Sequence, residues 1–234
     1  MASGLVSVIV ASYNHRDYLK ERMDSLINQT YQNLEILVID DCSTDGSVVV
    51  LWGYESHPEV KFSIREINGG WVNVSNQGVD ISEGEFIIFA NCDDACEPQM
   101  LEKLVESINK NPTAGISYCR SKMIDQSGKL LGDDFLIREK AFRNFCDTDI
   151  LVPKDIFRKF LLNSCVIPNL SAALFRKNCY IFSGRMTALY KVCADWDLFF
   201  RVTQYYDIAY ISEPLNSFRQ HQTTIRNTTK EQIY

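Results

Sequence analysis

The sequence predicts an α/β fold with a mostly parallel central sheet, and three observations lead to that prediction. Strand-like and helix-like segments alternate through the first half of the 234 residues. Two strand-like segments, residues 34–39 and 85–90, are filled by apolar, β-branched and aromatic residues, which is typical of buried parallel strands. Acidic pairs follow both segments, at residues 40–41 and 93–94. Open α/β sheets bind ligands beyond this end of their strands, so the acids predict a ligand site there.

In the first half, short apolar runs bounded by polar turns predict strands at residues 6–11, 34–39, 60–64 and 85–90. Apolar residues at helical spacing predict helices at residues 18–28, 72–81 and 99–109. The hydroxyl and carboxylate side chains of residues 43–47 suit a turn that starts a further helix. Pro98 suits the start of the helix at 99–109, because the first helical turn does not use its missing N–H. This alternation favours a three-layer α/β/α arrangement.

After residue 119 the pattern is less regular. Residues 125–129 are typical of a hairpin turn, and the mixed residues 132–152 indicate a mobile loop. The remaining expected elements are a short strand at 171–175 and helices at 153–162, 176–182 and 195–206.

The composition argues against several classes of protein. The formal net charge is −6 and no long basic run occurs, which disfavours a nucleic-acid partner. No apolar stretch approaches the roughly 18 residues of a membrane-spanning helix, and no signal peptide is visible, so we expect a cytoplasmic protein. The eight cysteines are scattered and form no Cys-x-x-Cys pair, so we expect reduced thiols that mostly fill the core.

The acidic pairs also carry a chemical implication. Adjacent carboxylates repel each other unless a cation or hydrogen-bond donors intervene. A hard divalent cation that carries a phosphorylated ligand is therefore the natural complement of Asp93 and Asp94. The structural alternative is that both acids cap the helix that begins at Pro98.

Five segments together resemble the inverting glycosyltransferases of family 2, which have the GT-A fold. They are residues 8–14 (VIVASYN), 40–47 (DDCSTDGS), 68–70 (NGG), 91–94 (NCDD) and 194–198 (ADWDL). Each segment alone is weak, but the five occur in the family's order and span about residues 5–221. The resemblance implies transfer of a sugar from a nucleotide diphosphate sugar to an acceptor hydroxyl, with inversion at the anomeric carbon.

The same resemblance implies the domain organisation. We expect a single three-layer GT-A domain over residues 1–222 and a polar tail over residues 223–234. Residues 1–95 correspond to the nucleotide-sugar-binding half, and residues 96–222 to a less regular half for metal and acceptor.

A nucleotide site is implied at the ends of the first two strands. Asp40 resembles the acid that accepts the N3–H of uracil or thymine, so the expected donor is a UDP-sugar or a dTDP-sugar. Its structural alternative is a helix cap. Asp41 is expected to contact the ribose or to cap the turn.

Two further motifs resemble parts of the same nucleotide site. Ser12, Tyr13 and Asn14 resemble a floor for the base, although an ordinary strand-to-helix loop with Asn14 as the helix cap explains them as well. Asn68 and Gly70 match the family's N-x-G, in which the glycine permits either close approach of a ligand or simply a turn.

A bound Mn²⁺ or Mg²⁺ is implied at the diphosphate. In the matching motif Asp93 faces the ribose and Asp94 holds the metal, which stabilises the leaving diphosphate as a Lewis acid. Asn91 stands where many relatives carry another aspartate, so it receives no metal contact. His221 resembles a histidine that joins the metal or phosphate shell in some relatives, and its alternative is an ordinary surface residue. Arg219 is expected to face the diphosphate or to pair with a nearby acid.

Asp195 matches the acid that begins a helix in the family's last motif, and the resemblance implies that it is the general base. The alternative is a purely structural helix cap. Asp197 is the weaker candidate, because a residue two positions further points to another side of the helix.

By analogy with bacterial relatives, we expect a role in surface-polysaccharide biosynthesis, with a saccharide or lipid-linked saccharide acceptor at the inner face of the membrane. Residues 157–160 (FRKF) suit either peripheral membrane association or a half-buried helix. A nucleotide-sugar binder without turnover is the main alternative, and Asp195 argues against it. A nucleotidyltransferase is disfavoured because residues 12–16 lack glycine, and a dinucleotide oxidoreductase because no G-x-G-x-x-G follows an early strand.

Overall fold

The computed structural model describes residues 4–133, 148–167, 169–190 and 192–221. Strands and helices alternate through the first half of the chain, as the apolar periodicity predicts. They are β1 (Val6–Ser12), α1 (Arg16–Ile27), β2 (Leu34–Asp40), α2 (Ser47–Trp52), β3 (Val60–Ile64), α3 (Trp71–Ile81) and β4 (Phe86–Phe89).

The described part of the second half contains both strands and helices. The elements up to the hairpin are β5 (Ala95–Cys96), α4 (Met100–Lys110), β6 (Ala114–Ile124) and β7 (Leu130–Asp133). The later elements are β8 (Ile150–Val152), α6 (Lys154–Leu161), η2 (Leu170–Ala172), β9 (Ala173–Arg176), α7 (Lys177–Phe182), α8 (Ala194–Val202) and β10 (Asp207–Arg219).

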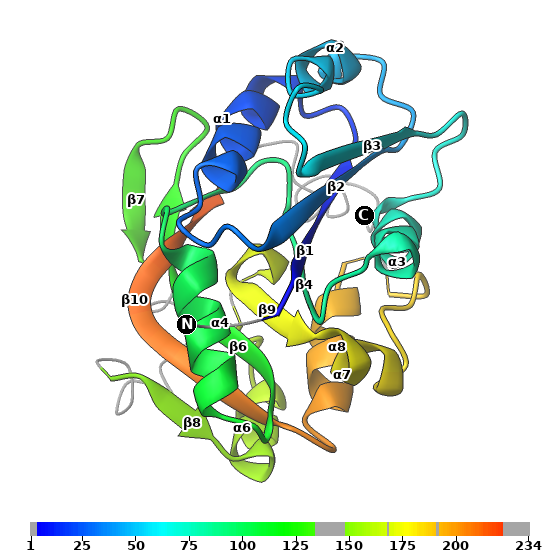
Figure 1. Cartoon of the computed structure of the whole chain (residues 1–234). Coiled ribbons are helices and arrows are strands. Elements are labelled where there is room, and N and C mark those ends of the chain that lie inside the picture. Colours follow the sequence, from blue (N-terminus) through cyan, green and yellow to red (C-terminus); the bar gives the residue numbers. More distant parts are fainter. Residues whose placement is uncertain (1–3, 134–147, 168, 191, 222–234) are drawn as a thin grey trace, which may run out of the picture.

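One continuous sheet joins the two halves (Figure 1), with the strand order β3-β2-β1-β4-β9-β6-β10-β5. The pairs β3–β2, β2–β1 and β1–β4 are parallel, so their carboxyl ends lie at one edge of the sheet. Strand β9 is antiparallel to both β4 and β6, whereas β10 runs parallel to β6. The antiparallel β9 therefore separates the parallel first half from a mixed second half.

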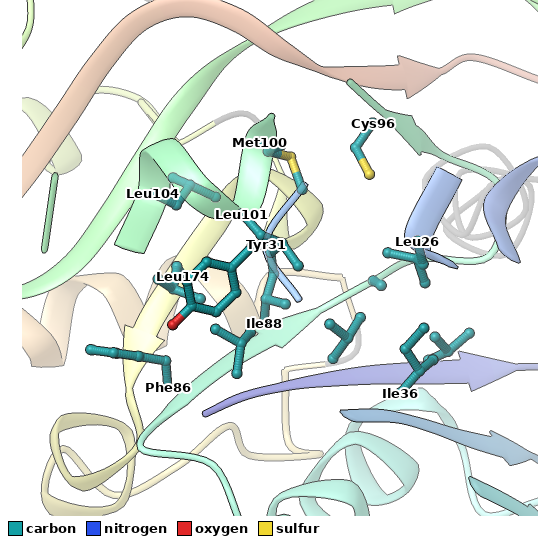
Figure 2. Close-up of a cluster of buried hydrophobic side chains, with 14 of the residues drawn as sticks. Leu26, Tyr31, Ile36, Phe86, Ile88, Cys96, Met100, Leu101, Leu104 and Leu174 are labelled. Carbon is teal, nitrogen blue, oxygen red and sulfur yellow. The ribbon is translucent and has the colours of Figure 1, made fainter. Parts of the chain in front are cut away.

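Two hydrophobic clusters fill the space between the sheet and its helices. In one cluster, α1 and α4 pack on the sheet, and their buried residues Leu26, Leu101 and Leu104 belong to the same cluster as strand residues such as Ile88 (Figure 2). In the other, α3, α6, α7 and α8 cover the opposite face through residues such as Phe199. The buried faces of these helices supply the main stabilisation, because apolar burial is the dominant favourable contribution to folding.

The predicted α/β fold class is confirmed, including helices on both faces of a large sheet. Three details differ from the expectations. Strand β10 was missed, because its apolar run is interrupted by Ser212, Glu213 and Pro214, and the pairing with β6 shifts register beside the proline. Helix α8 ends at Val202, four residues before the expected end. Part of the expected loop at 132–152 forms β7 and β8, and residues 134–147 and 222–234 lie outside the described chain.

The segment considered for a membrane surface lies on α6. Phe157 is fully buried, and the guanidinium of Arg158 donates to the carbonyl oxygen of Thr203. These two side chains therefore pack onto the protein. Across the described residues, no helix has the length and apolar character needed to cross a membrane.

Candidate active site

A cavity of about 610 Å³ lies at the carboxyl ends of the parallel strands, within the size range of ligand sites in proteins. Eight of the sequence-predicted site residues line it: Ser12, Tyr13, Asn14, Asp41, Asn68, Gly70, Asp93 and Asp195. Three others, Asp40, Asp94 and His221, are not among its lining residues. The polar groups outside the expected set that line it include His15, Asn91, Asn169 and Gln220.

Asp40 joins the ends of β1 and β2 from inside the protein. Its carboxylate accepts hydrogen bonds from the Ser12 hydroxyl at 2.9 Å and from the Ser43 amide and hydroxyl at 2.8 and 2.7 Å. The Asn14 amide donates to Ser43 Oγ at 3.0 Å, and Asn14 Oδ1 accepts from the Thr44 amide at 2.9 Å. Because Asp40 is fully buried, it shapes the loops around the expected base site and does not present its carboxylate to the cavity.

Asp41 connects the end of β2 to the turn before α3. Its carboxylate accepts the amide hydrogens of Gly69 and Gly70, each at 2.8 Å, and lies 3.5 Å from Arg65 Nη1. Gly70 has φ +82°, a conformation that residues with a side chain rarely adopt. A carboxylate offers about four lone-pair positions, so Asp41 keeps acceptor capacity for a ligand in the cavity that it lines.

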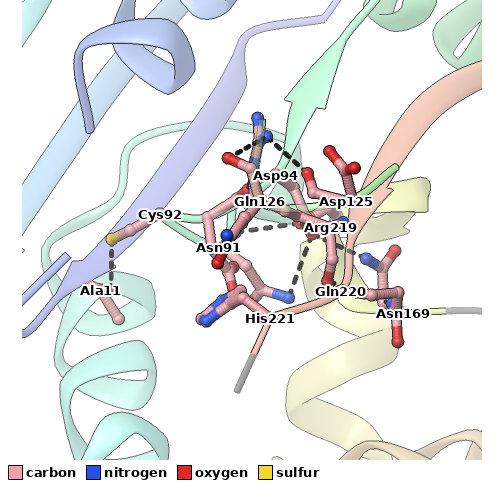
Figure 3. A network of polar contacts seen from close by, with 12 residues as sticks. Ala11, Asn91, Cys92, Asp94, Asp125, Gln126, Asn169, Arg219, Gln220 and His221 are labelled. Carbon is pink, nitrogen blue, oxygen red and sulfur yellow. Dashed lines mark hydrogen bonds and ion pairs between the residues drawn. The ribbon is translucent and has the colours of Figure 1, made fainter. Parts of the chain in front are cut away.

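Asp94 is the centre of a buried polar network that joins the loop after β4 to β10 (Figure 3). Its Oδ2 accepts hydrogen bonds from Ser171 Oγ at 2.6 Å and Asn169 Nδ2 at 2.7 Å. Asn91 Nδ2 lies 3.4 Å from the same oxygen, and the Arg219 amide donates to Oδ1 at 3.0 Å. Protein donors therefore occupy both oxygens of the residue that the sequence assigned to the metal.

Asp93 lies instead beside two histidines. Its Oδ2 is 2.9 Å from His221 Nε2, and one ligand atom each of His15, Asp93 and His221 lie within 4.8 Å of one another. Burial tends to raise the pKa of Asp93, but the His221 hydrogen bond and the charges of both histidines outweigh it, so the pKa is lowered. Burial and the neighbouring Asp93 charge raise the pKa of Asp94 to about 7. Of the two carboxylates, Asp93 is therefore the one whose ionised form is favoured.

Two imidazoles and a carboxylate form a donor set that fits a divalent transition metal. Within the described ranges, His15, Asp93 and His221 are the one group of this kind. The sequence interpretation missed His15, although it directly follows Asn14 in the first motif and is one of only three histidines. Asn169 and Ser171 carried no motif, so their role beside Asp94 had no signal in the sequence.

Arg219 holds the acidic loop and does not face the cavity. Its Nε donates to the Asp93 carbonyl at 2.7 Å, and Nη1 donates to the Asp125 carbonyl at 3.0 Å. Nη2 forms an ion pair with Glu21 at 2.5 Å, and the guanidinium lies 5.0 Å from the centre of the Tyr18 ring. Of the two expected roles, the structure therefore favours pairing with an acid.

Asp195 and Asp197 differ in their surroundings although both lie in the first turn of α8. Asp195 lines the cavity, and its Oδ1 accepts the Trp196 amide at 2.8 Å. Asp197 forms an ion pair with Arg201 at 2.7 Å, and the same guanidinium donates to the Arg185 carbonyl at 2.6 Å. Asp195 is thus the acid of the two that lines the cavity, whereas Asp197 ties α8 to the preceding segment.

Comparison with known proteins places this arrangement among the glycosyltransferases. An uncharacterized glycosyltransferase of Rickettsia typhi is 28% identical over 235 residues, which cover 99% of this chain and 69% of that protein. The putative teichuronic acid biosynthesis glycosyltransferase TuaG of Bacillus subtilis is 33% identical over 133 residues, covering 56% of this chain and 52% of TuaG. The chain thus spans about half to two thirds of these relatives.

Solved structures share the fold. S. aureus TarS 1–349 in complex with UDP superposes with a TM-score of 0.73 at 23% identity, covering 93% of this chain and 61% of that one. The mannosyltransferase PcManGT from Pyrobaculum calidifontis, in complex with GDP-Man and Mn²⁺, has a TM-score of 0.68 at 19% identity, covering 97% and 59%. These likenesses confirm the GT-A fold.

The profile of the family described as Glycosyl transferase family 2 matches residues 7–161, which is more than half of the 234 residues. The matched range contains most of the residues that line the cavity, including Asp41 and Asp93, whereas Asp195 lies beyond it. On this evidence the chain belongs to glycosyl transferase family 2.

Proposed function

We propose that this chain is a metal-dependent glycosyltransferase that moves a sugar from a UDP-sugar or dTDP-sugar to an acceptor hydroxyl, with inversion. The observation that carries the proposal is the cavity in which Asp41, Asp93 and Asp195 come together from three separate parts of the chain. Family membership supports sugar transfer, and the fold shared with a UDP complex supports a nucleotide donor.

We assign recognition of the donor's nucleotide base to Asp41 in place of Asp40. Asp41 lines the cavity, whereas the oxygens of Asp40 accept hydrogen bonds from Ser12 and Ser43. A carboxylate accepts the N3–H of uracil or thymine, whereas adenine and cytosine present an unprotonated ring nitrogen at the equivalent position, which a carboxylate repels. Tyr13 and Asn14 form the adjoining wall of the cavity.

For the metal we assign Asp93 and His221 as ligands in place of Asp94. Their facing atoms are 2.9 Å apart, and a carboxylate with an imidazole is a donor pair that suits Mn²⁺. A structure of the same fold is a complex with Mn²⁺, which supports the choice. When bound, the cation supplies Lewis-acid stabilisation of the leaving diphosphate.

For the transfer step we assign the general base to Asp195. Its carboxylate takes the proton of the acceptor hydroxyl while that oxygen forms a bond to the anomeric carbon. The bond between this carbon and the diphosphate oxygen breaks with its electron pair remaining on the diphosphate. Attack from the side opposite the leaving group inverts the anomeric centre. Asp195 lines the cavity, consistent with contact to a bound acceptor.

For the acceptor we propose a saccharide or lipid-linked saccharide of a bacterial surface polysaccharide, used at the cytoplasmic face of the membrane. The similarity to a putative teichuronic acid biosynthesis enzyme supports this class. The side chains of Leu189 and Tyr190 are exposed just before Val192, which lines the cavity near Asp195. Exposed apolar and aromatic side chains beside a sugar site suit an acceptor that has apolar faces.

The test measures donor binding and sugar release in the same preparation. UDP-sugars are titrated with Mn²⁺ or with EDTA while binding and hydrolysis of the donor are followed. We expect binding with slow hydrolysis in Mn²⁺ and neither in EDTA. Tight binding with no release or transfer of sugar, across a panel of saccharide acceptors, would support the non-catalytic binder instead. Full activity in EDTA would contradict the metal-dependent mechanism.

A further inference from the structure

We propose that His15 is a third protein ligand of the metal, which makes the site a set of two imidazoles and one carboxylate. The inference rests on the proposed function, because it extends the metal site assigned there to Asp93 and His221. Its consequence is selectivity: this donor set favours Mn²⁺ and other first-row transition metals over Mg²⁺.

The first support is geometric. The ligand atoms of His15, Asp93 and His221 all lie within 4.8 Å of one another, a separation that one cation can bridge through bonds of about 2.0–2.2 Å with small side-chain adjustments. The two imidazole rings meet edge to face with centres 5.8 Å apart. His221 is also packed against Tyr18, whose ring centre is 4.9 Å away.

The second support is the fixed position of His15. It is the residue before α1, and its carbonyl accepts the amide hydrogens of Tyr18 and Leu19, both at 3.1 Å. On its other side, Asn14 is bonded to Ser43 and Thr44. Hydrogen bonds thus anchor the backbone of His15 and the residue before it, and His15 lines the cavity.

The third support is the charge of the site, because Asn91, which lines the cavity next to the acidic pair, carries an uncharged amide. The Asn91 amide nitrogen lies 3.4 Å from Asp94 Oδ2, and its backbone N–H donates to Ser171 Oγ at 3.0 Å. Asp93 is then the one acid that the described residues bring to the group with the histidines. The His15 imidazole would add a third protein ligand to Asp93 and His221 without adding negative charge.

This donor set determines which cation binds. Mg²⁺ prefers six oxygen ligands and keeps several waters, so two nitrogen ligands make a poor site for it. Imidazole nitrogen suits the first-row transition metals, and two histidines with one carboxylate leave open positions for further oxygens. The diphosphate of the donor provides such oxygens. When bound, the cation would be held by residues of the loop after β1, the loop after β4 and the segment after β10.

The experiment measures Mn²⁺ binding itself, with no activity readout. Protein stripped with EDTA and dialysed is titrated with Mn²⁺, and free Mn²⁺ is quantified by electron paramagnetic resonance, first alone and then with saturating UDP. The variants are His15→Ala, His221→Ala, Asp93→Ala and the control His57→Ala. His57 is the third histidine of the chain; it pairs with Glu59 at 3.4 Å and is not part of the metal group.

We expect His15→Ala to weaken Mn²⁺ binding by about 10-fold or more, the scale on which metal sites respond to lost partners, and His57→Ala to bind as wild type. If His15→Ala binds within twofold of wild type while Asp93→Ala and His221→Ala lose the metal, the inference is overturned and the proposed metal site stands. If none of the three variants changes Mn²⁺ affinity, the metal assignment in the proposed function falls as well.

A second variant tests selectivity and does not depend on total affinity. His15→Asp replaces the nitrogen ligand with oxygen, and Mg²⁺ competition against bound Mn²⁺ gives the preference ratio. We expect the preference for Mn²⁺ over Mg²⁺ to fall by about 10-fold or more in His15→Asp. An unchanged ratio would overturn the role of His15 even if both metals bind. Circular dichroism of each variant shows whether it is folded.

Discussion

Arg219 Nη2 lies 2.5 Å from Glu21 Oε2, and this ion pair joins the end of β10 to α1 beneath the acidic loop. The arginine is almost fully buried, whereas about half of the glutamate side chain is exposed. The guanidinium also donates to the carbonyl oxygens of Asp93 and Asp125. One side chain therefore connects the loop that carries Asp93, the β6–β7 turn and helix α1.

Arg219→Met is expected to destabilise the fold by about 3 kcal/mol, because it leaves buried carbonyl oxygens without their donor. The free energy of unfolding in EDTA, measured by denaturant titration, gives the value. Glu21→Gln is the matched control, and its loss should stay below about 1 kcal/mol because the carboxylate is half exposed. Equal losses in both variants would show that the ion pair, and not the carbonyl contacts, provides the stability.

Asp195→Asn is expected to lower turnover by a factor of about 10² to 10⁴ with donor affinity near that of wild type, because an amide cannot accept the acceptor's proton. Steady-state transfer, or donor hydrolysis where the acceptor is not known, checks turnover, and calorimetry checks donor binding. Asp197→Asn is the comparison: its ion pair with Arg201 predicts a lower Tm with turnover largely kept. Wild-type turnover in Asp195→Asn would move the base elsewhere, and loss of folding would favour the capping role.

The donor base is expected to be uracil or thymine. UDP or dTDP with Mn²⁺ should raise the Tm more than GDP or ADP does at the same concentration, since a ligand that binds the folded state stabilises it more when its Kd is lower. Asp41→Asn should reduce this preference, because the substitution replaces one acceptor oxygen with an NH₂ group, which cannot accept the N3–H. Asp40→Asn is expected to lower Tm without nucleotide, through its contacts with Ser12 and Ser43. Tightest binding of GDP would contradict the assignment of either acid.

Glu35, which does not line the cavity, makes a pH-dependent contribution to the stability of the fold. Burial tends to raise its pKa, but hydrogen bonds from Ser7 Oγ at 2.7 Å, the Glu83 amide at 2.7 Å and Lys61 at 2.9 Å outweigh it and lower the pKa. Because the pKa of Glu35 is lower in the folded state than in the unfolded state, this carboxylate stabilises the protein at pH values above its ordinary pKa of 4.5. This stabilisation is lost as the pH falls through the folded-state pKa.

Glu35→Gln is therefore expected to lower the free energy of unfolding by about 1–3 kcal/mol at pH 7, the scale of hydrogen bonds to a charged group. The difference from wild type should shrink below pH 4.5, where the unfolded carboxyl is already protonated. Urea titrations at several pH values measure it. Glu83→Gln, at a largely exposed side chain, should show little effect, and a pH-independent loss in Glu35→Gln would refute the ionisation argument.

The sequence was sufficient to predict the fold class and the first-half elements, because parallel strands buried on both faces carry strong apolar runs. It was also sufficient to predict cavity-lining positions such as Asp41, Asp93 and Asp195. The sequence did not reveal which acid of each pair lines the cavity and which is enclosed by other protein groups. Neighbouring carboxylates are distinguished only by their partners, and Ser171, Asn169 and Arg219 lie 77, 75 and 125 residues from Asp94.

Strand β10 illustrates a second limit of local patterns. A proline and two polar residues at 212–214 hide a 13-residue strand that pairs with β6 through a register shift. The same strand delivers Arg219 and leads to His221, so the missed element also obscured the surroundings of the metal group.

The bond between the Arg219 amide and Asp94 also bears on folding kinetics. It closes a loop of 125 residues, and such long-range contacts form late because chain entropy is lost before they compensate for it. The cavity should therefore be among the last features to form, although three of the strands at its base, β1, β2 and β4, lie early in the chain. A nascent chain that has emerged only as far as β9 should hold much of its secondary structure yet remain unable to retain metal. In refolding experiments, Mn²⁺ uptake should lag behind the recovery of helical signal.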